Sequence, residues 1–185
     1  MMRALGLLLV AAACDARAVA QPSAPALAPT DVRPAAVVPS GWVPQPALVE
    51  VVRGVVLPVG STYVAVDAWG DPGAGCFALW TTTQRTRPST LAAEHADLAR
   101  ALAPLGVAAL PPLPAGATTW TATVDAAVVE GGLRGKLRVS LGGAPAAVTL
   151  AQAACMHNAR EPIYCEAACA SLLDAAAPRP SGSTP

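Results

Sequence analysis

The stretch at residues 155–169, read as CMHNAREPIYCEAAC, contains three of the five cysteines and one of the two histidines of the chain. Pro162 lies within it and suits the first position of a helix, because proline lacks only the N–H group that this position leaves unpaired anyway. We therefore expect Cys155 to end a strand, and Cys165 and Cys169 to lie in the helix that follows. The stretch predicts a C-terminal helix that is fastened to the rest of the fold.

The cysteine pattern predicts two disulfides. Apart from Cys14 near the N-terminus, the cysteines are Cys76, Cys155, Cys165 and Cys169, an even number, as expected of an exported chain. Cys165 and Cys169 lie one helical turn apart, where a bond between them has poor geometry, so each is expected to bond outward, to Cys76 or to Cys155. We favour Cys155 with Cys165 and Cys76 with Cys169, although the spacing also allows the opposite cross-pairing.

A metal site is the alternative interpretation of the same stretch. Cys155, His157, Cys165 and Cys169 have the spacing C-x-H-x7-C-x3-C and would suffice for a tetrahedral zinc site or, with Met156, a soft copper site. The spacing matches no common zinc signature, one cysteine is left over, and an oxidising compartment disfavours free thiols. Disulfides are therefore preferred, and no cofactor is expected.

The first twenty residues, MMRALGLLLVAAACDARAVA, have the layout of a secretory signal. A positive charge at Arg3 precedes an apolar run over residues 4–13, and the small residues at 18–20 form a cleavage site. The apolar run is far shorter than the roughly twenty residues that a membrane-spanning helix needs. Cleavage after Ala20 would release a soluble protein that begins at Gln21.

A second processing route is also open. Ala11-Ala12-Ala13-Cys14 resembles a bacterial lipobox, in which the cysteine is lipidated and becomes the mature N-terminus, although that pattern prefers Leu where this chain has Ala11. Cys14 lies directly where the apolar run ends, which supports this route. The chain is thus expected to be exported to the periplasm, anchored in the envelope or secreted, with membrane contact only through a lipid on Cys14.

The segments flanking the predicted domain have a composition that disfavours packing. Residues 21–47 are rich in Pro and Ala and are predicted to form either a semi-rigid spacer or a disordered leader. Trp42 is the exception, because a lone tryptophan at the end of a linker typically marks where the chain first docks on the fold. Residues 177–185, APRPSGSTP, are predicted to be a disordered tail.

The predicted domain covers residues 48–176. Runs rich in β-branched and aromatic residues, bounded by Gly and Pro, predict strands at 48–59, 62–69, 76–83, 118–130, 136–141 and 146–154. Leucines at helical spacing predict a helix at about 89–104, with Ser89 or Thr90 as its N-cap, and a second helix covers 162–176. The prolines of 106–116 predict a loop. The fold class is therefore α+β, an antiparallel sheet made of two three-strand meanders, each followed by a helix and stapled by disulfides.

Two short motifs support a resemblance to a known fold. They are Pro-x-Gly-Trp at residues 39–42 and S-T-L-A-A-E at residues 89–94, set in the order meander, helix, meander, helix. This arrangement resembles the Mog1/PsbP-like fold, a group that includes bacterial envelope lipoproteins. The resemblance implies a fold and a compartment. The four cysteines are not part of that general pattern, and it implies no functional residues.

Charge and motifs exclude several classes of function. Twelve basic residues balance twelve acidic ones and form no basic stripe, so nucleic acid is not an expected partner. The chain contains no nucleophile elbow, zinc-protease motif, phosphate loop or dinucleotide fingerprint. A hydrolase would need His95 or His157 beside a serine and a carboxylate. His95 is expected to be a packing residue, and Trp69, Trp80 and Trp120 are expected to supply core bulk, with a ligand groove as the alternative.

These observations together predict a non-enzymatic exported protein of the bacterial envelope. Its disulfide-stapled domain is expected to bind another envelope component or a small apolar ligand. The alternative is an exported metal-binding protein or metalloenzyme that uses Cys155, His157, Cys165 and Cys169.

Overall fold

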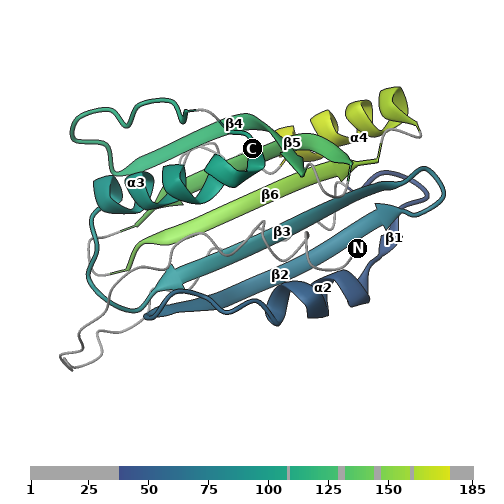
Figure 1. The fold of residues 1–185 in the computed structure, drawn as a ribbon. Coiled ribbons are helices and arrows are strands. Elements are labelled where there is room, and N and C mark those ends of the chain that lie inside the picture. The colour runs from purple at the N-terminus through teal and green to yellow at the C-terminus, as the bar shows by residue number, and fades with distance from the viewer. Residues whose placement is uncertain (1–37, 108, 129–131, 144–146, 159–160, 176–185) are drawn as a thin grey trace, which may run out of the picture.

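The computed structural model describes residues 38–107, 109–128, 132–143, 147–158 and 161–175. One antiparallel sheet of six strands forms its centre, with the order β1-β2-β3-β6-β5-β4 (Figure 1). The strands are β1 (Val43–Pro44), β2 (Ser61–Asp71), β3 (Cys76–Arg85), β4 (Thr119–Val128), β5 (Leu133–Gly142) and β6 (Thr149–His157). The predicted α+β class with an antiparallel sheet and two disulfides is confirmed.

Three helices cover the two faces of the sheet. They are α2 (Pro46–Arg53), α3 (Leu91–Leu102), which continues into the 3-10 turn η3 (Ala103–Leu105), and α4 (Pro162–Ala175). Because side chains alternate along a strand, each strand contributes to both faces. On one face, α2 and α3 pack on a core that includes Val52, Leu98 and Leu137. On the other face, α4 packs on a second core built from Trp42, Trp80 and all four disulfide cysteines.

Helix α3 is formed as the sequence predicts. The Thr90 side chain accepts a hydrogen bond from the Ala93 backbone N–H at 3.1 Å, which caps the first turn. Leu98 and Leu102 are buried against the sheet. In the segment predicted as a loop, residues 106–116, the described part contains neither helix nor strand.

The strand predicted at residues 48–59 is wrong, because this segment begins with helix α2 and continues as a loop. Its valines favour a strand by propensity, but Leu48, Val49 and Val52 also recur at helical spacing and pack on the α3 face of the sheet. Pro46 lies in the first turn, where proline is tolerated, and Gly54 ends the helix. The first strand is instead the two-residue β1, which pairs with Gly70 and Trp69 of β2.

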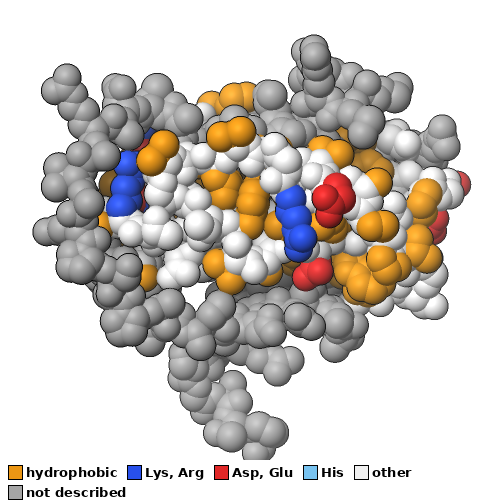
Figure 2. Space-filling model, turned by 90° about the horizontal axis from the view of Figure 1, so that it is seen from below, with side chains coloured by type: hydrophobic (Ala, Val, Ile, Leu, Met, Phe, Trp, Pro, Cys, Tyr) orange, Lys and Arg blue, Asp and Glu red, His pale blue; other side chains and the backbone are white. Residues whose placement is uncertain are grey.

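The edge of the sheet next to α2 is shown in Figure 2, where hydrophobic side chains are spread over a surface with few charged ones. Four of the exposed large hydrophobic residues belong to β1, β2 and the loop between α2 and β2, namely Val43, Val56, Val59 and Val64. The register of β2 shifts between Tyr63 and Ala65, and β1 covers its far end. A short covering strand and a bulge both discourage further strands from adding to an edge.

Several predicted segments lie outside the described residues. These are the signal peptide, the lipobox at Cys14, the linker up to residue 37 and the tail at 177–185. The rest of the predicted linker belongs to the packed fold, because Trp42 is buried and the Gln45 N–H donates to the Ala68 carbonyl at 2.9 Å. The expected docking of Trp42 is thus confirmed. Within the described ranges, no helix combines the length and the apolar character that crossing a membrane requires.

Candidate functional site

Both disulfides join α4 to the sheet. Cys165 is bonded to Cys76 on β3, with 5.6 Å between the Cα atoms, and Cys169 is bonded to Cys155 on β6, with 5.3 Å. The cross-pairing that we favoured from sequence is therefore wrong. The reason lies in the register: Cys76 is opposite His157, at the end of the sheet where α4 begins, whereas Cys155 lies two residues further in. Cys165, which comes earlier in the helix, therefore meets Cys76, and Cys169 lies one turn further along, over Cys155.

The metal site considered as the alternative interpretation is incompatible with this arrangement. Three of its four ligands, Cys155, Cys165 and Cys169, are half-cystines, and a disulfide sulfur offers no thiolate to a zinc or copper ion. Among the residues that the structure describes, no group of three or more His, Cys, Asp or Glu side chains has the arrangement of a metal site. The cysteines thus act as covalent fasteners, and all four are buried.

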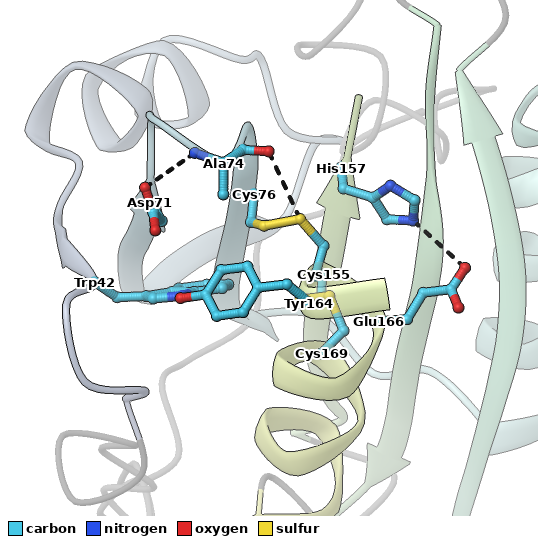
Figure 3. Close-up of a disulfide and its surroundings, with 10 residues drawn as sticks. Trp42, Asp71, Ala74, Cys76, Cys155, His157, Tyr164, Glu166 and Cys169 are labelled. Atoms are coloured by element: carbon cyan, nitrogen blue, oxygen red, sulfur yellow. Dashed lines mark hydrogen bonds and ion pairs between the residues drawn. A yellow bond between two sulfur atoms is a disulfide. The ribbon is translucent and has the colours of Figure 1, made fainter. Parts of the chain in front are cut away.

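The start of the described chain is held against the same helix. The Trp42 indole N–H donates to the Tyr164 hydroxyl at 3.2 Å, and Figure 3 shows the two rings side by side next to the Cys76–Cys165 disulfide. At the turn between β2 and β3, the Ala74 N–H donates to the Asp71 carboxylate at 3.1 Å. The N-terminal turn of α4 is therefore fixed both by a disulfide and by the hydrogen bond from Trp42 to Tyr164.

An open cavity of about 730 Å³ lies beside this helix, where the β4–β5 hairpin ends. Its lining is mixed. Leu105, Ala126 and Leu133 supply apolar walls, and Cys169 and Glu166 contribute the α4 side. Four further charged or titratable side chains complete the polar part of the lining, namely Asp125, Arg134, Lys136 and His157. Its size is within the range of small-molecule sites, which combine apolar walls with a few polar groups.

Three basic residues alternate along β5 on the face that α4 covers. Arg138 donates to the Leu173 carbonyl at 3.3 Å, near the C-terminus of α4, where a cation is favourable. Lys136 binds Asp125 of β4 at 2.8 Å. Arg134 is exposed, and in the described part of the chain it has no carboxylate partner. Among these three side chains, Arg134 is thus the one that neither a carboxylate nor a carbonyl of the described residues engages.

His157 is the buried polar group of the cavity lining, with 2% of its surface exposed. It lies between Cys76 of β3 and Arg134 of β5, which are its cross-strand neighbours in the sheet. Its Nε2 atom is 3.9 Å from the Glu166 carboxylate, and Figure 3 shows the imidazole directed toward that side chain. The sequence singled out His157 as a metal ligand; the structure instead makes it part of a cavity with mixed charges.

A second polar cluster lies at the opposite end of the sheet. Arg85 of β3 places its Nε 2.9 Å and 3.0 Å from the two carboxylate oxygens of Glu94, and its Nη1 donates to Ser61 at 2.8 Å. Both side chains of this ion pair are 9% exposed. The small cavity that they line, of about 50 Å³, leaves room for little more than water. This cluster therefore anchors α3 to the sheet.

The ion pair between Arg85 and Glu94 was not predicted, although the sequence contains a signal for it. Glu94 lies three residues after Leu91 and four before Leu98, on the same helix face as both. A carboxylate on the buried face of a helix needs a cation nearby, since an unpaired buried charge is costly. The sequence did not indicate which arginine would supply it.

The remaining sequence candidates have packing roles. His95 Nε2 lies 2.9 Å from the Pro111 carbonyl oxygen, and its ring meets that of Trp120 edge-on at 4.6 Å between centroids. Trp80 and Trp120 are buried in the two cores, whereas Trp69 is partly buried against the α4 core. The Ser61 and Ser140 hydroxyls hydrogen-bond with Arg85 and Thr121. Neither of these hydroxyls is joined to a histidine.

Comparison with known proteins found no matching family model, no matching curated protein and no matching solved structure.

Proposed function

We propose that this chain is an exported protein of the bacterial envelope that acts by binding, as a non-catalytic module held together by two disulfides. Its ligand is another envelope component or a small apolar molecule. Two disulfides are compatible with export, because they form and persist in oxidising compartments. After export the chain is either released with Gln21 at its N-terminus or held at the membrane by a lipid on Cys14.

The observation that supports binding most directly is the way in which α4 is attached. Cys169 lines the cavity and is bonded to Cys155 of β6, while Cys165 fixes the preceding turn of the same helix to β3. A cavity wall that is covalently fixed on two strands keeps its shape in the absence of ligand. Preformed cavities bind more tightly, since less conformational entropy is lost when the ligand enters.

The test is to recover the ligand with the protein. The full chain is exported to a bacterial periplasm, purified without detergent and weighed by native mass spectrometry. We expect a bound small molecule that is lost when Ala127, an exposed residue of the cavity lining, is replaced in Ala127→Trp. The control Ala47→Trp places the same side chain on the exposed side of α2 and should retain the adduct. Equal retention in both variants, or no adduct in the unaltered protein, would contradict a binding role for this cavity.

A further inference from the structure

We propose that the cavity beside α4 binds the oxyanion head of an amphiphilic molecule, a carboxylate or phosphate group carried on an apolar chain, through the guanidinium of Arg134. This inference rests on the proposed binding function and specifies the chemistry of the ligand.

The charge pattern of β5 identifies Arg134 as the residue that would bind the head group. Arg138 is engaged by the carbonyl of Leu173, and Lys136 is engaged by Asp125. Arg134 lines the cavity, and in the described part of the chain no carboxylate is paired with it. A guanidinium presents several N–H donors in a planar fork that matches a carboxylate or phosphate.

The surroundings of Arg134 favour an anion over a second cation. Each acidic group of the lining has a nitrogen-bearing neighbour: Asp125 lies 2.8 Å from Lys136, and Glu166 lies 3.9 Å from His157, which is an ion pair only when the imidazole is protonated. His157 is directly opposite Arg134 in the β5–β6 ladder, on the same face, so its ring adds a second nitrogen-bearing group beside the guanidinium. Arg134 is the cation of the lining that has no carboxylate within ion-pair distance among the described residues.

The apolar part of the lining indicates what the oxyanion is attached to. Leu105 and Ala126 are already buried in the core on the α3 side. Ala127 of the lining, by contrast, is exposed and lies directly opposite Arg134 in the β4–β5 ladder. The half-buried Leu133 lines the same cavity next to Arg134. An alkyl chain that extends from an oxyanion at Arg134 would cover the exposed Ala127 side chain, which a small inorganic anion would leave in water, and burial of apolar surface would then add to the affinity.

The test uses three probes with the same alkyl chain, namely decanoate, decyl phosphate and the neutral decanol, titrated into the full-length protein by calorimetry. We expect at least one anionic probe to bind more tightly than decanol. Arg134→Gln should weaken binding of that probe about tenfold or more, the usual loss for a charge-assisted hydrogen bond, and should leave decanol unchanged. Arg134→Lys should give an intermediate loss, because it keeps the charge without the fork. Whether decanoate or decyl phosphate depends on Arg134 identifies the head group.

The control variant is Arg87→Gln, which removes an exposed arginine from the loop after β3 and the same net charge. It should bind all probes like the unaltered protein. Equal losses in Arg87→Gln and Arg134→Gln would show a general charge effect and overturn the inference, as would decanol binding as tightly as both anions. In the latter case the cavity would still be an apolar binding site. The loss of a natural adduct in Ala127→Trp remains the separate measure of the proposed function.

Discussion

Arg134 on β5 lies directly opposite His157 on β6, on the face of the sheet that α4 covers. The pairing of these two residues brings together two separate segments of the chain, the charged strand β5 and the cysteine-rich C-terminal stretch. The two disulfides hold α4 over this point, so the cavity at Arg134 has a fixed wall. The chemistry proposed for the cavity thus depends on the geometry that the disulfides maintain, and the stability of that geometry can be tested directly.

The two disulfides are expected to contribute unequally to the free energy of unfolding. The Cys76–Cys165 bond spans a sequence separation of 89 residues and the Cys155–Cys169 bond one of 14. In the chain-entropy model, their removal costs about 4.5 and about 3 kcal/mol respectively, because the longer loop restricts the unfolded chain more. Paired Cys→Ala variants should show this order in urea unfolding under non-reducing conditions. A larger loss from removing Cys155–Cys169 would indicate that native-state contacts, and not loop entropy, decide the order.

The buried ion pair between Arg85 and Glu94 should be needed for stability. Glu94→Gln leaves a guanidinium that is 9% exposed without its main counter-charge, and we expect a loss of about 3 kcal/mol or more in urea unfolding. Asp97 is the matched case, because its side chain is 33% exposed and lies 3.8 Å from Arg85. Asp97→Asn should cost less than about 1 kcal/mol. Similar losses in both variants would mean that the depth of burial does not govern this cluster.

Tyr63 should make the fold sensitive to alkaline pH. Burial raises the pKa of its phenol above the usual 10.0, and its buried hydroxyl has no hydrogen-bond partner in the described structure. Since the folded state favours the neutral phenol, this contribution to stability is fully present below the unfolded-state pKa and is lost as the pH rises through the folded-state pKa. In chemical unfolding followed from about one pH unit below the usual phenol pKa to about one unit above it, Tyr63→Phe should remove this part of the decline. An identical decline in the variant would assign the alkaline sensitivity to other groups.

Many of the strands and helices can be predicted from local patterns in the sequence. The predicted strands at 62–69 and 76–83 lie within β2 and β3, and Pro162 begins α4 as expected. Helix α2 was missed because its valines satisfy strand propensity and helical spacing at once, and only packing decides between them. The resemblance to the Mog1/PsbP-like fold stays a prediction.

The candidate site was harder to predict than the fold, because its parts meet only through strand register. The alternation of Arg134, Lys136 and Arg138 is visible in the sequence, but nothing in it places Arg134 opposite His157. The prediction of the disulfide pairing was wrong for the same reason. The pairing depends on which residues of β3 and β6 lie under each turn of α4. The density of cysteines identified the correct region of the chain and the correct chemistry, two disulfides, but not which cysteines pair.

Gly135 should be required where β5 passes β6 at the cavity. A Cβ atom at this position would overlap the backbone carbonyl oxygen of Cys155, so Gly135→Ala must push the two strands apart. Gly142, at the other end of β5, is the matched control, because a Cβ there makes only an ordinary contact with the Thr119 side chain. We expect Gly135→Ala to lower the free energy of unfolding by about 2 kcal/mol or more and Gly142→Ala to change it by less than about 1 kcal/mol.

The same pair of variants separates a structural role of Gly135 from an effect on binding. Displacement of β5 would move Arg134 away from His157, so Gly135→Ala should weaken binding of the anionic alkyl probe under conditions where the variant is still folded. Gly142→Ala should bind like the unaltered protein. Calorimetry at a temperature well below both melting points measures this difference. Full affinity in a folded Gly135→Ala variant would show that head-group binding tolerates displacement of β5. It would contradict the proposal that the head group needs Arg134 and His157 side by side.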